Sequence, residues 1–143
     1  MKEQISVVIA DDHDVVRGGF KAARRTSPDF NVIGEARDGL EAVKQAKAWK
    51  PDLVVMDVRM PRMSGIEACR EIRAETESRV LILTSYGDEK AVMAAIIAGA
   101  GGFMLTEVQT AKRLDAMRTV GRGGSILDES SSAAVIARIR KGT

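Results

Sequence analysis

The sequence is poor in several residue types, and each shortage limits the class of protein that it can encode. It has 143 residues, one cysteine and 3% aromatic residues. The single cysteine, Cys69, cannot form an internal disulfide and is typical of a protein from a reducing compartment. With so few aromatic side chains, the core must be aliphatic. The chain also lacks a stacking platform for single-stranded nucleic acid.

Long apolar runs, internal repeats and low-complexity segments are also missing. No stretch approaches the length of a membrane span, and residues 1–4 precede a strand-like segment rather than the core of a signal peptide. The net charge of +2 is too small to indicate a polyanionic partner. With 45% hydrophobic and 29% charged residues, the composition is that of an ordinary globular domain. We therefore expect a cytoplasmic protein that makes no membrane contact.

Short apolar strands alternate with amphipathic helices along the chain. This alternation predicts an α/β fold with a doubly wound, five-stranded parallel sheet, right-handed crossovers and helices on both faces. In the first helix we expect Val15, Val16, Phe20 and Ala23 to face the core. The predicted strands are 5–10, 31–36, 53–57, 79–84 and 102–105, and the predicted helices are about 14–25, 40–49, from 64 onward, 88–98 and 107–120.

The C-terminal segment follows a unit that is already complete. Residues 121–124 break the pattern with three glycines, and residues 128–141 are predicted to form an amphipathic helix that is basic at its end. Its apolar residues Val135, Ile136 and Ile139 have no place in the five-stranded unit, so we expect them to pack against the domain or a second subunit. We predict one domain at 1–121 and a linker or interaction helix at 122–143.

Polar side chains stand at the ends of three predicted strands. Asp11 and Asp12 follow the first strand, Asp57 ends the third and Thr84 ends the fourth. The carboxyl ends of parallel strands lie along one edge of the sheet, so these groups can converge. Neighbouring carboxylates repel one another, and hard oxygen ligands with room for water suit Mg²⁺. Such a site could transfer a phosphoryl group onto Asp57, with Thr84 as a hydrogen-bond donor.

Each of these features has a simpler interpretation when it is taken alone. An Asp-Asp pair after a strand is usually a turn, and Asp57 could merely cap the turn that follows it. His13 is interpreted as a structural or supporting residue, and Arg59 and Arg62 as a solvated basic loop. Because the polar groups coincide at three strand ends of one sheet, we favour a functional site.

Residues 5–120 resemble the receiver domain of two-component response regulators. Within that family, the Asp-Asp-His opening, the residues after the fourth strand and the tail resemble the subfamily with a LuxR-type helix-turn-helix output. The likeness is closest to the actinobacterial dormancy regulators. The matching segments are Ala10-Asp11-Asp12-His13, Asp57-Val58-Arg59-Met60-Pro61-Arg62-Met63-Ser64-Gly65, Leu83-Thr84-Ser85 and Gly99-Ala100-Gly101-Gly102-Phe103.

The resemblance implies a role for each acidic residue. Asp57 would accept phosphate from a sensor histidine kinase. Asp12 and Asp57 would bind Mg²⁺ directly, Asp11 would act largely through water, and the backbone carbonyl of Arg59 would be the third protein ligand. The chain would act as a homodimer and reach DNA only through an output domain, because one tail helix cannot supply a helix-turn-helix.

The resemblance also implies a phosphate-dependent switch, with one departure from the family pattern. Thr84 would move toward the phosphoryl group. Phe103 would be the switch aromatic, a role that is compatible with plain core packing. Members of the family carry a lysine after the fifth strand, and here that position is Thr106. Threonine is neutral and too short to replace the lysine ammonium, so we expect weakened switching.

Three other functions compete with that of a phosphorylated receiver. Thr106 supports the first, a degenerate receiver that works as a phosphorylation-independent dimerisation module. A phosphatase of the haloacid-dehalogenase kind needs a second Asp two residues after the nucleophile, where this chain has Arg59. A flavodoxin-like electron carrier must bind phosphate in its first loop, where the carboxylates of Asp11, Asp12 and Asp14 would repel it. We therefore expect a signalling protein rather than an enzyme.

Overall fold

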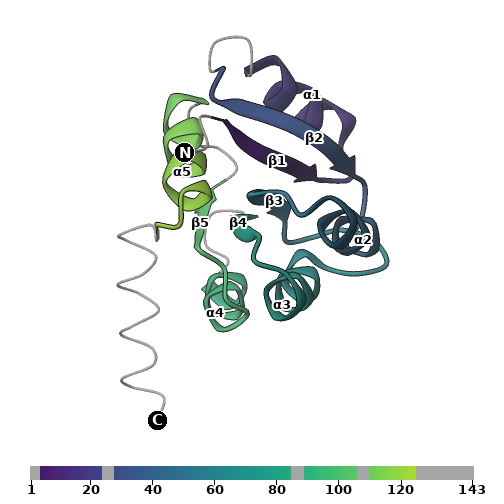
Figure 1. Ribbon diagram of the computed structural model, residues 1–143. Helices are drawn as coiled ribbons and strands as arrows, with labels where there is room; N and C mark the ends of the chain where they lie inside the picture. The colour runs from purple at the N-terminus through teal and green to yellow at the C-terminus, as the bar shows by residue number, and fades with distance from the viewer. Residues whose placement is uncertain (1–3, 24–27, 85–88, 106–109, 125–143) are drawn as a thin grey trace.

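Five parallel strands form one sheet, as the alternating pattern predicted, and their order is β2-β1-β3-β4-β5 (Figure 1). The computed structural model describes residues 4–23, 28–84, 89–105 and 110–124. The strands are β1 (Ile5–Ala10), β2 (Phe30–Ala36), β3 (Leu53–Asp57), β4 (Arg79–Thr84) and β5 (Gly102–Leu105). The helices are α1 (Asp14–Ala23), α2 (Gly39–Trp49), α3 (Gly65–Glu75), α4 (Glu89–Ile97) and α5 (Thr110–Gly121).

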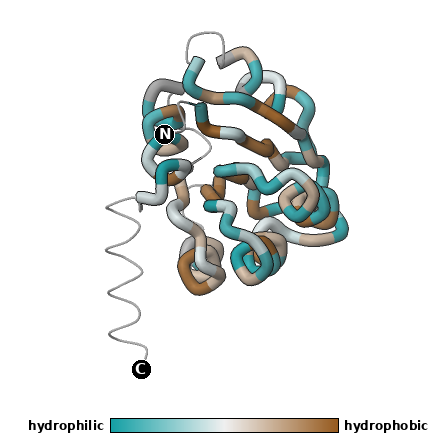
Figure 2. Tube along the Cα trace, in the orientation of Figure 1, coloured by the Kyte–Doolittle hydropathy of each residue, from teal (hydrophilic) through white to brown (hydrophobic). Residues whose placement is uncertain are grey.

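The helices cover both faces of the sheet, and each face has its own aliphatic core. Because successive strand residues point to opposite faces, Val8 and Val54 pack with α2, α3 and α4, whereas Val7 and Val55 pack with α5. Val16 of α1 packs against this second core. All four strand valines are completely buried, and the β1 segment of the tube is largely hydrophobic in Figure 2.

The burial of α1 differs from the sequence prediction. Val15 was expected to face the core but is 87% exposed, whereas Arg17, which was not expected there, is 5% exposed. The long side chain of Arg17 reaches oxygen atoms of Asp11, Asp14 and Glu35, and these contacts offset the cost of burying its charge. The side chains of Phe20 and Ala23 lie outside the described part of the structure.

Side-chain caps begin the two helices that flank β3. Asp38 accepts a hydrogen bond from the amide of Glu41 at 2.9 Å and caps α2. Ser64 accepts from the amide of Glu67 at 3.2 Å and caps α3. Because these helices follow β2 and β3, both start at the carboxyl edge of the sheet, where Asp11, Asp12 and Asp57 also lie.

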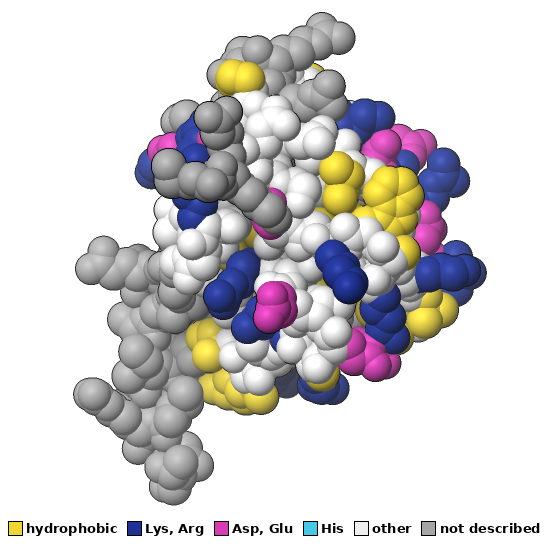
Figure 3. Space-filling view, viewed as in Figure 1, with side chains coloured by type: hydrophobic (Ala, Val, Ile, Leu, Met, Phe, Trp, Pro, Cys, Tyr) yellow, Lys and Arg dark blue, Asp and Glu magenta, His cyan; other side chains and the backbone are white. Residues whose placement is uncertain are grey.

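Exposed apolar side chains mark the end of α4. Ile97 is 75% exposed and Ile96 is 38% exposed, and hydrophobic atoms gather over α4 at the lower left of Figure 3. Among the described residues, no helix is long and apolar enough to cross a bilayer. The predicted helix at 128–141 lies outside the described residues, so both that helix and the domain boundary near residue 121 stay predictions.

An ion pair joins α5 to the start of β2 and makes stability depend on pH. Arg118 Nε donates to Asp29 Oδ2 at 2.6 Å, and its guanidinium lies 5.3 Å from the centre of the Phe30 ring. The hydrogen bond from Arg118 lowers the pKa of Asp29. The unfolded chain therefore binds this proton more tightly. The stabilisation is complete at neutral pH and is lost as the pH falls from about 4 through the lowered pKa.

We expect Arg118→Met to lower the free energy of unfolding by about 1 kcal/mol at pH 7. The difference from the parent protein should disappear below the pKa of Asp29 in the folded chain. Urea unfolding at a series of pH values measures both effects. Lys112→Met, an exposed change on the same helix, is the control. A difference that persists unchanged at low pH would show that the packing of Arg118 on Phe30, rather than its charge, carries the effect.

Candidate functional site

Four side chains meet at the carboxyl edge of the sheet. Ligand atoms of Asp11, Asp12, His13 and Asp57 all lie within 4.8 Å of one another. The sheet explains this meeting, because β1 and β3 are neighbours and Ala10 pairs with Met56. Asp11 follows Ala10 and Asp57 follows Met56, so the register of the two strands brings the two carboxylates together. The three carboxylates that were expected to converge therefore lie together.

His13 is more closely involved in this cluster than the sequence suggested. Its Nδ1 lies 2.9 Å from Asp11 Oδ1 and 3.0 Å from Asp12 Oδ1. The hydrogen bond to Asp11 and the charge of Asp12 raise the pKa of His13. The amide of His13 also donates to Asp11 Oδ1 at 2.9 Å. Asp11 itself is buried, whereas Asp12 and His13 are exposed, so the cluster opens to solvent on one side.

The surroundings of Asp57 disfavour its negative charge. Burial raises the pKa of its carboxyl, and the charges of Asp11 and Asp12 raise it further. The amide of Arg59 opposes this shift by donating to Asp57 Oδ1 at 3.2 Å. A partly buried carboxylate beside two others is stabilised by a cation. The oxygen donors of this cluster therefore fit Mg²⁺, which favours carboxylates and water.

A glycine allows α3 to begin close to the main chain of Asp57. The amide of Gly65 donates to the carbonyl of Val58 at 2.9 Å. A Cβ atom at position 65 would lie 2.1 Å from the carbonyl oxygen of Asp57, closer than real atoms approach. Only glycine fits there without a shift of the main chain that carries the Asp57 carboxylate.

The loop after β3 also rests on the start of α2. The amide of Gly39 donates to the carbonyl of Met63 at 3.0 Å. Arg62, in a left-handed conformation at φ 67°, forms an ion pair with the carboxylate of Asp38, which is 2% exposed. Arg62 is exposed, as expected of a solvated loop residue, but its ion pair with Asp38 was not foreseen from the sequence. Its guanidinium compensates the buried charge that caps α2.

The expected switch residues occupy β4 and β5. Thr84 ends β4 and is 2% exposed, and its Oγ1 has no hydrogen-bond partner among the described residues. Such a hydroxyl is available to an incoming oxygen. Phe103 is 1% exposed and belongs to the same core as Ala95 of α4 and Ala98, which follows that helix. It therefore packs in the core, which is compatible with its expected role as the switch aromatic. Thr106 lies outside the described residues.

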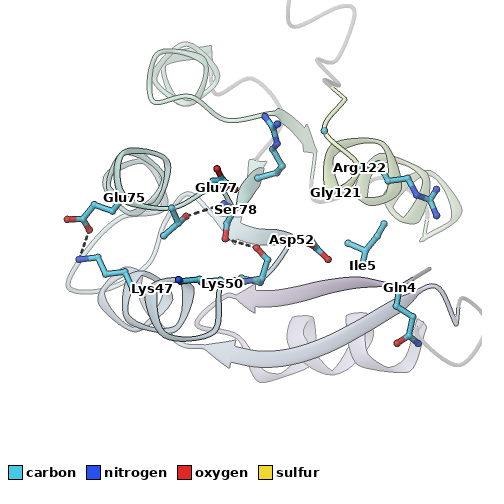
Figure 4. Close-up of a pocket in the computed structure, with 14 residues that line it drawn as sticks. Gln4, Ile5, Lys47, Lys50, Asp52, Glu75, Glu77, Ser78, Gly121 and Arg122 are labelled. Atoms are coloured by element: carbon cyan, nitrogen blue, oxygen red, sulfur yellow. Dashed lines mark hydrogen bonds and ion pairs between the residues drawn. The ribbon is translucent and has the colours of Figure 1, made fainter. Parts of the chain in front are cut away.

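A hollow at the other edge of the sheet is separate from the acidic cluster (Figure 4). It lies where β1 and β4 begin and where α5 ends. Lys47 and Glu75 form an ion pair of 2.5 Å on one side of it, and Ser78 donates to the carbonyl of Pro51 at 2.6 Å. Its charged groups are thus of both signs, and the groups that could carry phosphoryl chemistry lie elsewhere.

Comparison with known proteins identifies the family. Residues 7–118 match the response regulator receiver domain. The chain belongs to this family.

Two curated relatives and one solved structure show the range of the likeness. The transcriptional activator DevR/DosR of Mycobacterium tuberculosis is 39% identical over 137 residues, which are 95% of this chain and 63% of that protein. LiaR of Bacillus subtilis is 38% identical, over 95% of this chain and 65% of its own length. The chain therefore spans less than two-thirds of these relatives. The signal receiver domain of NarL from Mycobacterium tuberculosis superimposes with a TM-score of 0.80, at 34% identity, over 85% of this chain and 98% of that one.

Proposed function

We propose that this chain is the phosphoaccepting receiver of a two-component response regulator and that Asp57 takes a phosphoryl group from a sensor histidine kinase. The main support is the convergence of Asp11, Asp12 and Asp57 at one edge of the sheet, in a chain that belongs to the receiver family. The names of relatives such as the DNA-binding transcriptional activator DevR/DosR favour control of transcription through an output domain outside this chain.

In the proposed step, Asp57 acts as a nucleophile. One carboxylate oxygen attacks phosphorus, a new O–P bond forms, and the P–N bond to the donor histidine breaks. The imidazole nitrogen leaves with the electron pair and takes up a proton. The amide of Arg59, which donates to Asp57 Oδ1 at 3.2 Å, favours the charged carboxylate that must attack and holds it in place. The hydroxyl of Thr84, which has no partner within the described part of the chain, would donate to a phosphoryl oxygen.

Asp12 and Asp57 would bind Mg²⁺ directly, with Asp11 acting through water and the carbonyl of Arg59 completing the protein ligands. Bound there, the ion offsets the negative charge that the phosphoryl group brings to three carboxylates. His13 lies against Asp11 and Asp12, so its imidazole must turn away or share the site when a cation enters. Phe103 would couple β5 to the phosphoryl group, and homodimerisation and a cytoplasmic location are part of the same proposal.

Thr106 supports a second candidate function, that of a degenerate receiver acting as a phosphorylation-independent dimerisation module. The two functions differ in one measurable property. We expect acetyl phosphate to label the protein in the presence of Mg²⁺ and not in excess EDTA, as seen by retardation in a phosphate-binding gel. A protein that stays unlabelled with Mg²⁺ at every donor concentration, yet is a stable dimer, would support the degenerate receiver instead.

A further inference from the structure

A buried arginine lies beneath the loop that carries two of the carboxylates. Arg17 of α1 is 5% exposed, although charged side chains are rarely so deeply buried unless they are paired. Its Nη1 donates to the carbonyl oxygen of Asp11 at 2.5 Å, and its Nε donates to Glu35 Oε1 at 3.2 Å. Its Nη2 donates to the carboxylate of Asp14. The guanidinium therefore binds the loop at both ends, at Asp11 and at Asp14.

These contacts connect the loop to the end of β2. Glu35 is the next-to-last residue of β2, and the amide of Asp11 donates to the carbonyl of Ala36 at 3.0 Å. The two main-chain polar groups of Asp11 are thus both held, the amide by β2 and the carbonyl by Arg17. In the described structure the carboxylate of Asp12 contacts only His13. The direction in which this carboxylate points therefore depends on the main chain of Asp11 and His13.

We propose that Arg17 is a positioning residue of the metal site, which holds the 11–14 loop so that the carboxylates of Asp11 and Asp12 face Asp57. The proposal rests on the proposed function, because it concerns the same Mg²⁺ site. Arginine suits the position since its planar fork donates in three directions at once, whereas a lysine ammonium is a point charge on a flexible stem. Arg17→Lys keeps the charge and removes this geometry.

The test compares metal affinity in three proteins, with Mn²⁺ as the probe and EPR of the free ion as the readout. Substitution of a residue that orients metal ligands typically weakens metal binding by about 10–100-fold. We therefore expect the dissociation constant for Mn²⁺ to rise by that factor in Arg17→Lys. Lys21→Met is the control, because Lys21 binds the same Glu35 at 3.0 Å but no atom of the loop. It changes the net charge, yet it should leave Mn²⁺ binding unaltered.

Several outcomes would overturn the inference. Equal affinities of Arg17→Lys and the parent protein would show that the loop needs no support from Arg17. Equal weakening in Arg17→Lys and Lys21→Met would show a general charge effect. If Arg17→Lys does not fold, Glu35→Met, which removes an acceptor of Arg17 without touching the loop, should still weaken binding several-fold, and unchanged affinity there would contradict the proposal. A parent protein that binds no Mn²⁺ would refute the proposed metal site itself, and the inference with it.

A purely structural role would lower stability without changing the site. Binding is therefore measured well below the melting temperature of every variant. Amide resonances provide a second readout. Those of Asp12 and His13 should shift in Arg17→Lys, whereas those of Arg118 and Val120, which lie near the end of α5 at the opposite edge of the sheet, should not. Weakened binding with unshifted loop resonances would contradict positioning as the cause.

Discussion

Thr106→Lys should accelerate labelling by acetyl phosphate by roughly a hundredfold, because a positioned cation in a partly desolvated site contributes a few kcal/mol to the transition state. Phosphorylation adds negative charge beside Asp11, Asp12 and Asp57, which already crowd one edge of the sheet. Threonine cannot offset that charge, whereas the lysine ammonium can. The same change should strengthen phosphate-dependent dimerisation, since the lysine would also report the phosphoryl group to β5.

Time courses of labelling at saturating Mg²⁺ measure the first effect, and sedimentation with and without acetyl phosphate measures the second. Thr106→Met, which lengthens the side chain without a charge, is the matched control and should label at the parent rate. If the lysine variant labels no faster and dimerises no more strongly than the parent, another group has taken over the role of the cation. Our account of a weakened switch would then be wrong.

Removing two of the three carboxylates should abolish saturable Mg²⁺ binding. The double variant Asp12→Ala with Asp57→Ala leaves Asp11 alone, and one buried carboxylate cannot hold the ion against its hydration. NMR titration of the parent protein should show shifts near residues 11–13 and 57–59 that saturate with Mg²⁺. Without the usual lysine the pocket is more negative, which favours the cation.

The control for this experiment removes equal charge elsewhere. Glu71 and Glu77 are both exposed and outside the cluster, so changing both to alanine should leave Mg²⁺ binding intact. Affinity that is unchanged in the Asp12 and Asp57 double variant would place the ion at another site and refute the proposed ligands.

The sheet and its polar edge could be predicted from the sequence because both depend on local patterns. Runs such as that of β4 are apolar at every position between their two ends, so strands buried on both faces stand out. Once the strands are parallel, the convergence of Asp11 and Asp57 follows from topology alone. The register of Ala10 with Met56 then sets how closely they meet.

Contacts between side chains of different elements could not be predicted in this way. Arg17 was missed because a charge on a helix is normally assigned to solvent, and its partner Glu35 lies on another strand. Val15 was placed in the core on spacing alone, although α1 turns it outward. The ion pair of Arg62 with Asp38 was missed for the same reason, since the two residues are 24 positions apart in the sequence. The helix spacing carries no information on such pairings.

The central claim is that Asp57 is the phosphoacceptor, and intact-mass measurement after treatment with acetyl phosphate and Mg²⁺ tests it most directly. The parent protein should gain the mass of one phosphoryl group, in a form that hydroxylamine removes, and Asp57→Asn should gain none. Asparagine keeps the size of the side chain, so a loss of labelling is due to the missing nucleophile rather than to a disturbed pocket. Equal labelling of the parent protein and Asp57→Asn would contradict the account, because the phosphoryl group would then reside on another residue.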